Sequence, residues 1–94
     1  MKTYYVYIMT NPKRTVLYTG FTSNLMARVE AHKSKSVKGF AARYNCTLLV
    51  YFEETDSSQT AFAREKGIKG WKCCKKDDLI RKVNPQLRDL SLDW

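Results

Sequence analysis

The first residues of the chain alternate between two sides, and this pattern constrains the fold more than any other feature of the sequence. In Thr3–Met9 every second residue is a tyrosine, valine or isoleucine. A period of two in a segment rich in aromatic and β-branched residues predicts a strand. Turn-forming residues follow at Asn11–Arg14, and Thr15–Thr19 predicts a second short strand that Gly20 is expected to end. The N-terminal segment is therefore predicted to form a β-hairpin.

Helices and one more strand are predicted after the hairpin. A capping residue, Thr22 or Ser23, followed by apolar residues at helical spacing predicts a first helix over Asn24–Lys35. The polar and basic segment 34–45 is expected to form a loop, and the apolar run Cys46–Glu54 predicts a third strand. Two further helices are expected, one from a cap at Asp56, Ser57 or Ser58 to Lys69, and one over Lys75–Val83 that Asn84 and Pro85 end.

This β-β-α-β-α-α order predicts an α/β fold of the α+β type, with a three-stranded, mainly antiparallel sheet and helices packed on it. We expect one domain over 1–94, built as two layers, because a chain of 94 residues can bury one sheet face under helices but not two separate cores. The longest apolar runs, Val6–Met9 and Thr47–Phe52, are too short to cross a bilayer, and the charged and aromatic start of the sequence leads us to expect no signal peptide. A cytoplasmic protein with no membrane partner is expected.

Charge gives the first indication of function. Seventeen basic residues oppose nine acidic ones, which gives a net charge of +8. The excess is greatest in Arg28–Arg43 and Arg64–Lys76. A basic field of this size favours a polyanion, because binding releases counterions, and we expect DNA as the partner, with RNA left open and protein partners unknown. The alternative is a lysine-rich surface that only keeps the protein in solution. The cations expected to contact nucleic acid are Lys33, Lys38, Arg43, Lys66, Lys69, Lys72, Lys75 and Lys76.

Two polar placements do not fit a purely structural pattern. Arg28 and His32 are four residues apart and lie beside the apolar stripe of the first predicted helix. Glu65 falls within the apolar arc of the second helix, where an unpaired carboxylate would lose several kcal/mol to desolvation. Glu65 therefore needs a cationic partner, and that partner is either a metal ion or a lysine such as Lys66, Lys69 or one of the third helix.

The hairpin is expected to bring Tyr7 and Tyr18 together, although each alone is an ordinary half-buried strand residue. Their context forms a motif. Tyr5-Val6-Tyr7 is followed by Tyr18-Thr19-Gly20, with eleven residues from Tyr7 to Tyr18, and Arg28 comes ten residues later. This arrangement resembles the GIY-YIG nuclease family, with Tyr5 at the position of the first glycine. The resemblance extends over about 4–84 and is nearest to a small stand-alone branch related to the N-terminal domain of the excinuclease C protein.

The resemblance implies a metal-dependent endonuclease that hydrolyses phosphodiester bonds in DNA, in repair or recombination. A free tyrosine has a pKa near 10, so a phenolate at neutral pH costs roughly 4 kcal/mol, and nearby cations reduce that cost. The implied roles are Tyr7 as general base, Tyr18 as its support, Arg28 on the phosphate, His32 orienting Tyr7 or relaying its proton, Glu65 as the ligand of one Mg²⁺ or Mn²⁺, and Asn84 as the C-terminal catalytic asparagine.

Two other functions stay open from the sequence. One is a catalytically weak or inactive nucleic-acid-binding module of the same fold, and the other is an adaptor whose basic surface binds an acidic protein. The nuclease hypothesis makes a geometric prediction: the side chains of Tyr7, Tyr18, Arg28, His32 and Glu65 should converge on one concave face, within reach of a single phosphate.

Overall fold

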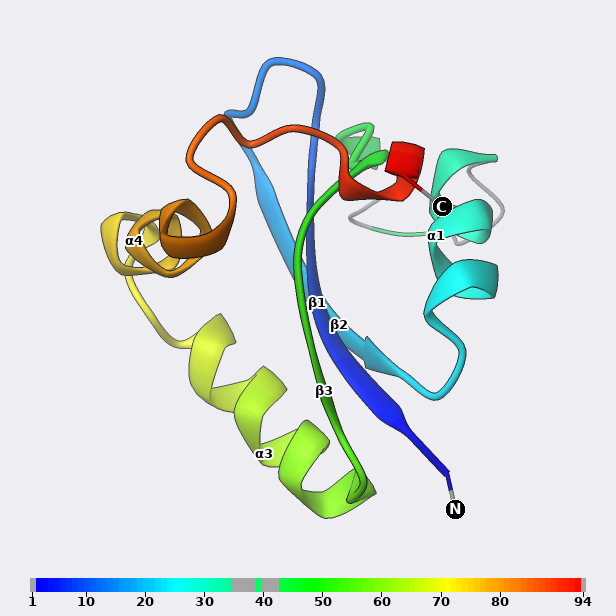
Figure 1. The fold of residues 1–94 in the computed structure, drawn as a ribbon. Helices are drawn as coiled ribbons and strands as arrows, with labels where there is room; N and C mark the ends of the chain where they lie inside the picture. The colour runs from blue at the N-terminus through cyan, green and yellow to red at the C-terminus, as the bar shows by residue number, and fades with distance from the viewer. Residues whose placement is uncertain (1, 35–38, 40–42, 94) are drawn as a thin grey trace.

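The chain forms a three-stranded antiparallel sheet in the order β2-β1-β3 (Figure 1). The computed structural model describes residues 2–34, 39 and 43–93. The central strand β1 (Tyr4–Thr10) pairs with β2 (Leu17–Thr22) on one side and with β3 (Leu48–Thr55) on the other. The predicted hairpin and the predicted antiparallel sheet are therefore confirmed.

Helices occupy the predicted places in the chain. They are α1 (Leu25–Lys33), α3 (Ser58–Lys69) and α4 (Cys73–Val83), and a short 3₁₀ helix, η1 (Leu90–Asp93), follows them. The β-β-α-β-α-α order and the α+β class are thus confirmed. Helix α4 begins earlier than the predicted start, and most of the segment expected as a loop lies outside the described residues.

The caps of the helices differ in part from the sequence prediction. Asn24 caps α1, and its side chain accepts a hydrogen bond from the Ala27 amide at 3.1 Å. The prediction of Thr22 or Ser23 as the cap is wrong, because the Thr22 hydroxyl accepts instead from the amide of Asn24 and forms the turn that precedes the helix. Ser57, one of the three residues predicted for α3, caps that helix through the Thr60 amide.

Helices cover both faces of the sheet, so the predicted two-layer arrangement is wrong. Val6 and Ile8 of β1 pack in one core with α3 and α4, whereas Tyr7 and Met9 pack in a second core with α1. In Figure 1, α1 lies on one side of the sheet and α3 and α4 lie on the other. The run Val6–Met9 is buried throughout, without a solvent-facing position. A central strand with apolar residues on both faces needs a helical layer on each.

Among the described helices, none combines the length and the apolar character that crossing a bilayer requires.

Candidate active site

Three of the predicted side chains meet on the α1 face of the sheet. The Tyr7 hydroxyl lies 3.0 Å from Nε2 of His32, within hydrogen-bonding distance, and both side chains are buried. The Tyr18 ring completes the cluster, with its centroid 6.4 Å from that of Tyr7 and 5.3 Å from that of His32. Antiparallel pairing of β1 with β2 brings the two tyrosines together, and α1 supplies the histidine from its last turn.

Gly20 gives Tyr7 the space for this position. The glycine is the direct β2 partner of Tyr7, and a Cβ atom added to it would lie 2.7 Å from the Tyr7 hydroxyl oxygen and 2.8 Å from Cζ. The prediction that Gly20 ends the strand is therefore wrong, because the glycine lies inside β2. Its missing side chain allows the phenol to lie over the β2 backbone.

Burial sets the protonation states of the pair. It raises the pKa of Tyr7 well above its ordinary value, with Tyr18 adding to the rise and the positive charge of Arg28 opposing it. Burial also lowers the pKa of His32, and Arg28 lowers it further. The imidazole is therefore neutral at neutral pH and has a nitrogen lone pair available for a proton. Nδ1 of His32 is buried and has no hydrogen-bond partner among the described residues.

Arg28 lies at the solvent side of the cluster. It is exposed, and it lies one helical turn before His32 on α1. Its positive charge lowers the pKa of His32 and opposes the rise in the pKa of Tyr7. A planar guanidinium in this position suits an incoming phosphate oxygen.

Glu65 reaches the same region from the opposite side of the sheet. It projects from α3, which packs on the other face from α1, and it is largely buried. Its Oε2 atom accepts from Lys69 Nζ at 2.8 Å, and that ammonium also lies 5.9 Å from the centroid of the Tyr18 ring. The charge of Glu65 contributes, as a smaller cause than burial, to the raised pKa of Tyr7. Tyr7, Tyr18 and His32 therefore lie together on the α1 face, whereas Glu65 approaches Tyr18 from the α3 side through Lys69, which differs from the predicted convergence on one concave face.

The lysine alternative for Glu65 is thus present, and its partner is Lys69. The pair has the i, i+4 spacing of one helix, and the lysine side chain is half exposed while only 11% of the glutamate side chain is. No group of three or more histidine, cysteine, aspartate or glutamate ligands occurs in the described part of the chain. A single carboxylate with substrate oxygens and water is nevertheless a normal Mg²⁺ donor set, so Glu65 fits one divalent ion if Lys69 moves away.

The side chain of Asn84 forms its hydrogen bonds outside this cluster, and its predicted catalytic role stays a prediction. Its side-chain amide donates to the backbone carbonyls of Val50, at 3.0 Å, and Arg88, at 2.8 Å. Its Oδ1 accepts from the Arg88 amide. Val50 belongs to β3, which pairs with β1 on the side away from β2, and it packs in the core of the α3 and α4 face. Asn84 therefore uses both amide hydrogens to fasten the segment after α4 to the sheet.

The predicted nucleic-acid-binding cations fall into several environments. Lys33 is paired with Asp89 and donates to the Thr47 carbonyl, contacts that stabilise the fold. Lys38 lies outside the described residues. Arg43 lies over the Tyr44 ring, Lys66 over Phe62 and Lys75 over Trp71.

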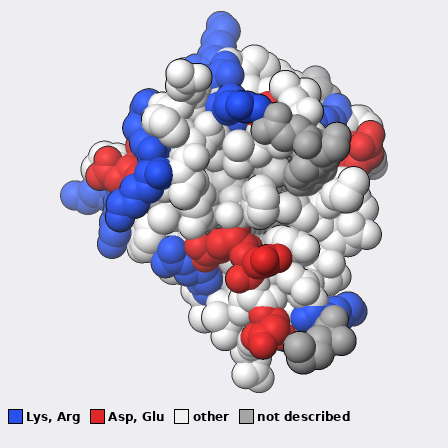
Figure 2. Space-filling model, in the orientation of Figure 1, with Lys and Arg blue, Asp and Glu red and all other residues white. Residues whose placement is uncertain are grey.

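Figure 2 shows basic side chains gathered over α4 and acidic ones over part of β3. Among the predicted cations of α3, α4 and the turn between them, Lys66, Lys69, Lys72 and Lys75 are exposed and Lys76 is partly buried.

One feature of the site was missed from the sequence. It is the place of Gly20 beneath Tyr7, for which the pairing of a glycine with a tyrosine in the hairpin was the available signal. Lys69 was predicted both as a possible partner of Glu65 and as a contact to nucleic acid, and in the structure it pairs with Glu65 beside Tyr18. The i, i+4 spacing of the two residues was the signal for that pair.

Comparison with known proteins identifies the family of this chain. A family model described as the GIY-YIG catalytic domain matches residues 3–76, and the chain therefore belongs to the GIY-YIG family of nucleases. The predicted resemblance to this family is confirmed.

Its relatives include proteins named UPF0213. One from Natronomonas pharaonis is 34% identical over 77 residues, which cover 82% of this chain and 89% of the relative. One from Staphylococcus haemolyticus is 40% identical over 73 residues, which cover 73% and 83%. The solution NMR structure of a UPF0213 protein from Bacillus halodurans superposes with a TM-score of 0.56 at 23% identity, covering 89% of this chain and 88% of the other. That likeness shows the shared fold.

Proposed function

We propose that this protein is a metal-dependent endonuclease that hydrolyses phosphodiester bonds in DNA, with a role in repair or recombination. The observation that carries the proposal is the buried hydrogen bond between Tyr7 and His32 beside the exposed guanidinium of Arg28. A nuclease needs a proton acceptor next to a cation that binds the phosphate, and these three residues supply both. The basic surface over α3 and α4 supports DNA as the substrate.

Tyr7 and His32 act together in the proposed mechanism. Burial raises the pKa of Tyr7, so at neutral pH its side chain is the protonated phenol. The phenol oxygen can accept the proton of the attacking water only if the phenol gives up its own proton at the same time. The neutral imidazole of His32, in hydrogen-bonding distance, accepts that proton, and the phenol oxygen takes the proton of the attacking water. Two coupled transfers avoid a free phenolate, whose formation at neutral pH would cost more than the roughly 4 kcal/mol of an unperturbed tyrosine.

In the proposed mechanism, Arg28 and Glu65 stabilise the negative charge of the reacting phosphate. The Arg28 guanidinium binds a non-bridging phosphate oxygen and so holds the reacting phosphorus beside Tyr7. Glu65 would hold one Mg²⁺ or Mn²⁺, which when bound supplies stabilisation of charge on the leaving oxygen. Lys69 then releases Glu65 and is free to contact the substrate backbone.

A nucleic-acid-binding module without effective catalysis is the second candidate. The observation that favours it is the Glu65–Lys69 ion pair, since a carboxylate that keeps its lysine holds no metal. In that case the basic surface binds DNA and the tyrosine cluster only stabilises the fold.

Incubation with DNA separates the two. Purified protein is mixed with supercoiled, single-stranded and branched DNA, with Mg²⁺ or Mn²⁺ or with a chelator. We expect metal-dependent cutting by the wild type, a loss of at least about a hundredfold in Tyr7→Phe from removal of the general base, and no loss in Tyr4→Phe. Tyr4 is a matched control because it belongs to the same strand but packs against the other core. Salt-sensitive binding without cutting by the wild type would establish the binding module instead.

A further inference from the structure

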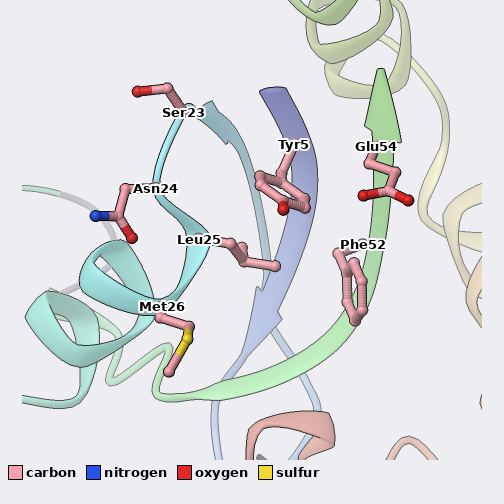
Figure 3. Close-up of a pocket in the computed structure, with 7 residues that line it drawn as sticks. All are labelled: Tyr5, Ser23, Asn24, Leu25, Met26, Phe52 and Glu54. Atoms are coloured by element: carbon pink, nitrogen blue, oxygen red, sulfur yellow. The ribbon is translucent and has the colours of Figure 1, made fainter. Parts of the chain in front are cut away.

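A second concave site lies on the α1 face of the sheet, beside the tyrosine cluster. Its volume is about 360 Å³, within the range of roughly 300–1,000 Å³ typical of small-ligand sites. Tyr5, Phe52 and Glu54 form its floor, and Leu25 and Met26 at the start of α1 form its wall (Figure 3). None of its lining residues other than Leu25 packs fully into a core.

The floor of this pocket presents aromatic rings to solvent. The Tyr5 and Phe52 rings lie edge to face, with centroids 6.5 Å apart and planes at 64°. Phe52 of β3 is 38% exposed and Met26 of α1 is 63% exposed. Exposed aromatic and thioether groups around a concavity are typical of a binding site for a flat apolar ring.

Glu54 adds a hydrogen-bond acceptor at the edge of these rings. It is the β3 partner of Tyr5, so both side chains extend from the same face of the sheet. Glu54 is exposed, and no ion pair involves it within the part of the chain that the structure describes, despite the net charge of +8. A carboxylate only accepts hydrogen bonds, so the ligand must present donors next to a flat ring.

The pocket adjoins the candidate active site. Phe52 is the direct β3 partner of Tyr7, and Tyr5 precedes Tyr7 by two residues on the same face, a spacing of about 6.8 Å along an antiparallel strand. Leu25 lines the pocket and packs in the same core as Tyr7, so it separates the two sites. The floor of the pocket therefore lies within two residues of Tyr7 along β1, on the same face of the sheet.

We propose that this pocket binds an unpaired nucleobase next to the phosphate that is cut, and that it prefers guanine. The base stacks on the aromatic floor, as in other recognition of single-stranded nucleic acids. Guanine presents two adjacent donors, N1–H and the N2 amino group, which a carboxylate accepts together, whereas thymine presents a single N–H and flanking acceptors that Glu54 repels. The proposal rests on the proposed nuclease function and names the part of the substrate that the protein reads.

Binding of short oligothymidylates that carry one central guanine, adenine, cytosine or no substitution tests the proposal. Fluorescence anisotropy with chelator present gives each Kd without cutting. We expect the wild type to bind the guanine strand about tenfold more tightly than oligothymidylate, the lower part of the range for one good bidentate contact. With metal present, cuts should fall at a fixed distance from the guanine.

Two charge-matched variants separate base reading from general electrostatics. Glu54→Gln and Glu30→Gln each remove one negative charge, and Glu30 is an exposed residue of α1 outside the pocket. Both should bind oligothymidylate slightly more tightly, but only Glu54→Gln should lose the guanine preference. Phe52→Leu keeps an apolar side chain but removes stacking, and it should weaken binding of every strand that carries a purine.

Each outcome decides the proposal. Equal affinity for all four strands, with cutting retained, would refute the base pocket and leave the nuclease intact. Neither binding nor cutting of any strand would refute the nuclease, and the pocket proposal with it. The methyl resonance of Met26 adds a local readout: deoxyguanosine monophosphate should shift it and thymidine monophosphate should not. A shift with methylguanidinium but not with either nucleotide would instead identify a site for a cationic group and overturn the proposal.

Discussion

Replacement of Glu65 by glutamine separates a metal-binding carboxylate from a structural one. In the native protein this carboxylate pairs with Lys69 across one helical turn, and half of the lysine side chain is exposed. Such pairs contribute only about 0.3–0.5 kcal/mol. Removal of a carboxylate that is mostly withdrawn from water offsets part of that loss. We therefore expect Glu65→Gln to change the free energy of unfolding by less than about 0.5 kcal/mol, or about 2–4 °C in Tm.

The matched variant is Lys69→Gln, which breaks the same ion pair but keeps the carboxylate. Thermal melts of both variants and the wild type, with and without Mn²⁺ and with a short duplex present, give the comparison. At a Mn²⁺ concentration ten times the Kd, binding stabilises the native state by about 1.4 kcal/mol. The wild type and Lys69→Gln should gain this stability, and Lys69→Gln should reach it at lower Mn²⁺ because no lysine competes for Glu65. Glu65→Gln should gain none and should not cut DNA.

Two results would refute this reasoning. A loss of about 3–5 kcal/mol in Glu65→Gln, the cost of breaking a buried pair, would assign the carboxylate to the fold. Cutting by Glu65→Gln at the wild-type rate would exclude it as the metal ligand.

Three further predictions concern the tyrosine cluster and its surroundings, and a fourth concerns Asn84. Gly20→Ala should displace Tyr7, cost about 1–3 kcal/mol in denaturant unfolding and reduce cutting, whereas Gly67→Ala, where an added Cβ meets nothing within 4 Å, should stabilise. Because the pKa of His32 is lowered in the folded state, its contribution to stability is fully present above about pH 6.5 and is lost as the pH falls through the folded-state pKa. His32→Gln should therefore lose less stability than the wild type on acidification. The raised pKa of Tyr7 has the opposite sign: its contribution is present below about pH 10 and is lost above it, and Tyr7→Phe should abolish that alkaline loss in unfolding titrations. Asn84→Ala should destabilise by about 2 kcal/mol or more because it leaves two backbone carbonyls without their donor. If the role of Asn84 is structural, the folded variant should cut at the wild-type rate, whereas a specific loss of cutting would support the predicted catalytic role.

Local sequence pattern determined the order of the elements. Alternation of apolar and polar residues, turn-forming residues and capping side chains act within a few positions of one another, so they can be read along the chain. The hairpin, the three helices and the antiparallel sheet were predictable in this way. The motif spacing also pointed to the GIY-YIG family without any knowledge of the geometry. The roles of Tyr7, Tyr18, Arg28, His32 and Glu65 stay proposals.

Only the tertiary structure decided how these elements use their side chains. The hydrogen bond between Tyr7 and His32 joins residues 25 positions apart, and the Asn84 amide reaches a strand 34 positions away. The helical layers on both faces, the space that Gly20 leaves for Tyr7 and the aromatic pocket beside Glu54 likewise depend on which strands pair and on where helices cross them. Periodicity and propensity describe a segment with its own neighbours, whereas burial and hydrogen-bond partners are set by contacts between segments, and those contacts exist only once the sheet has formed.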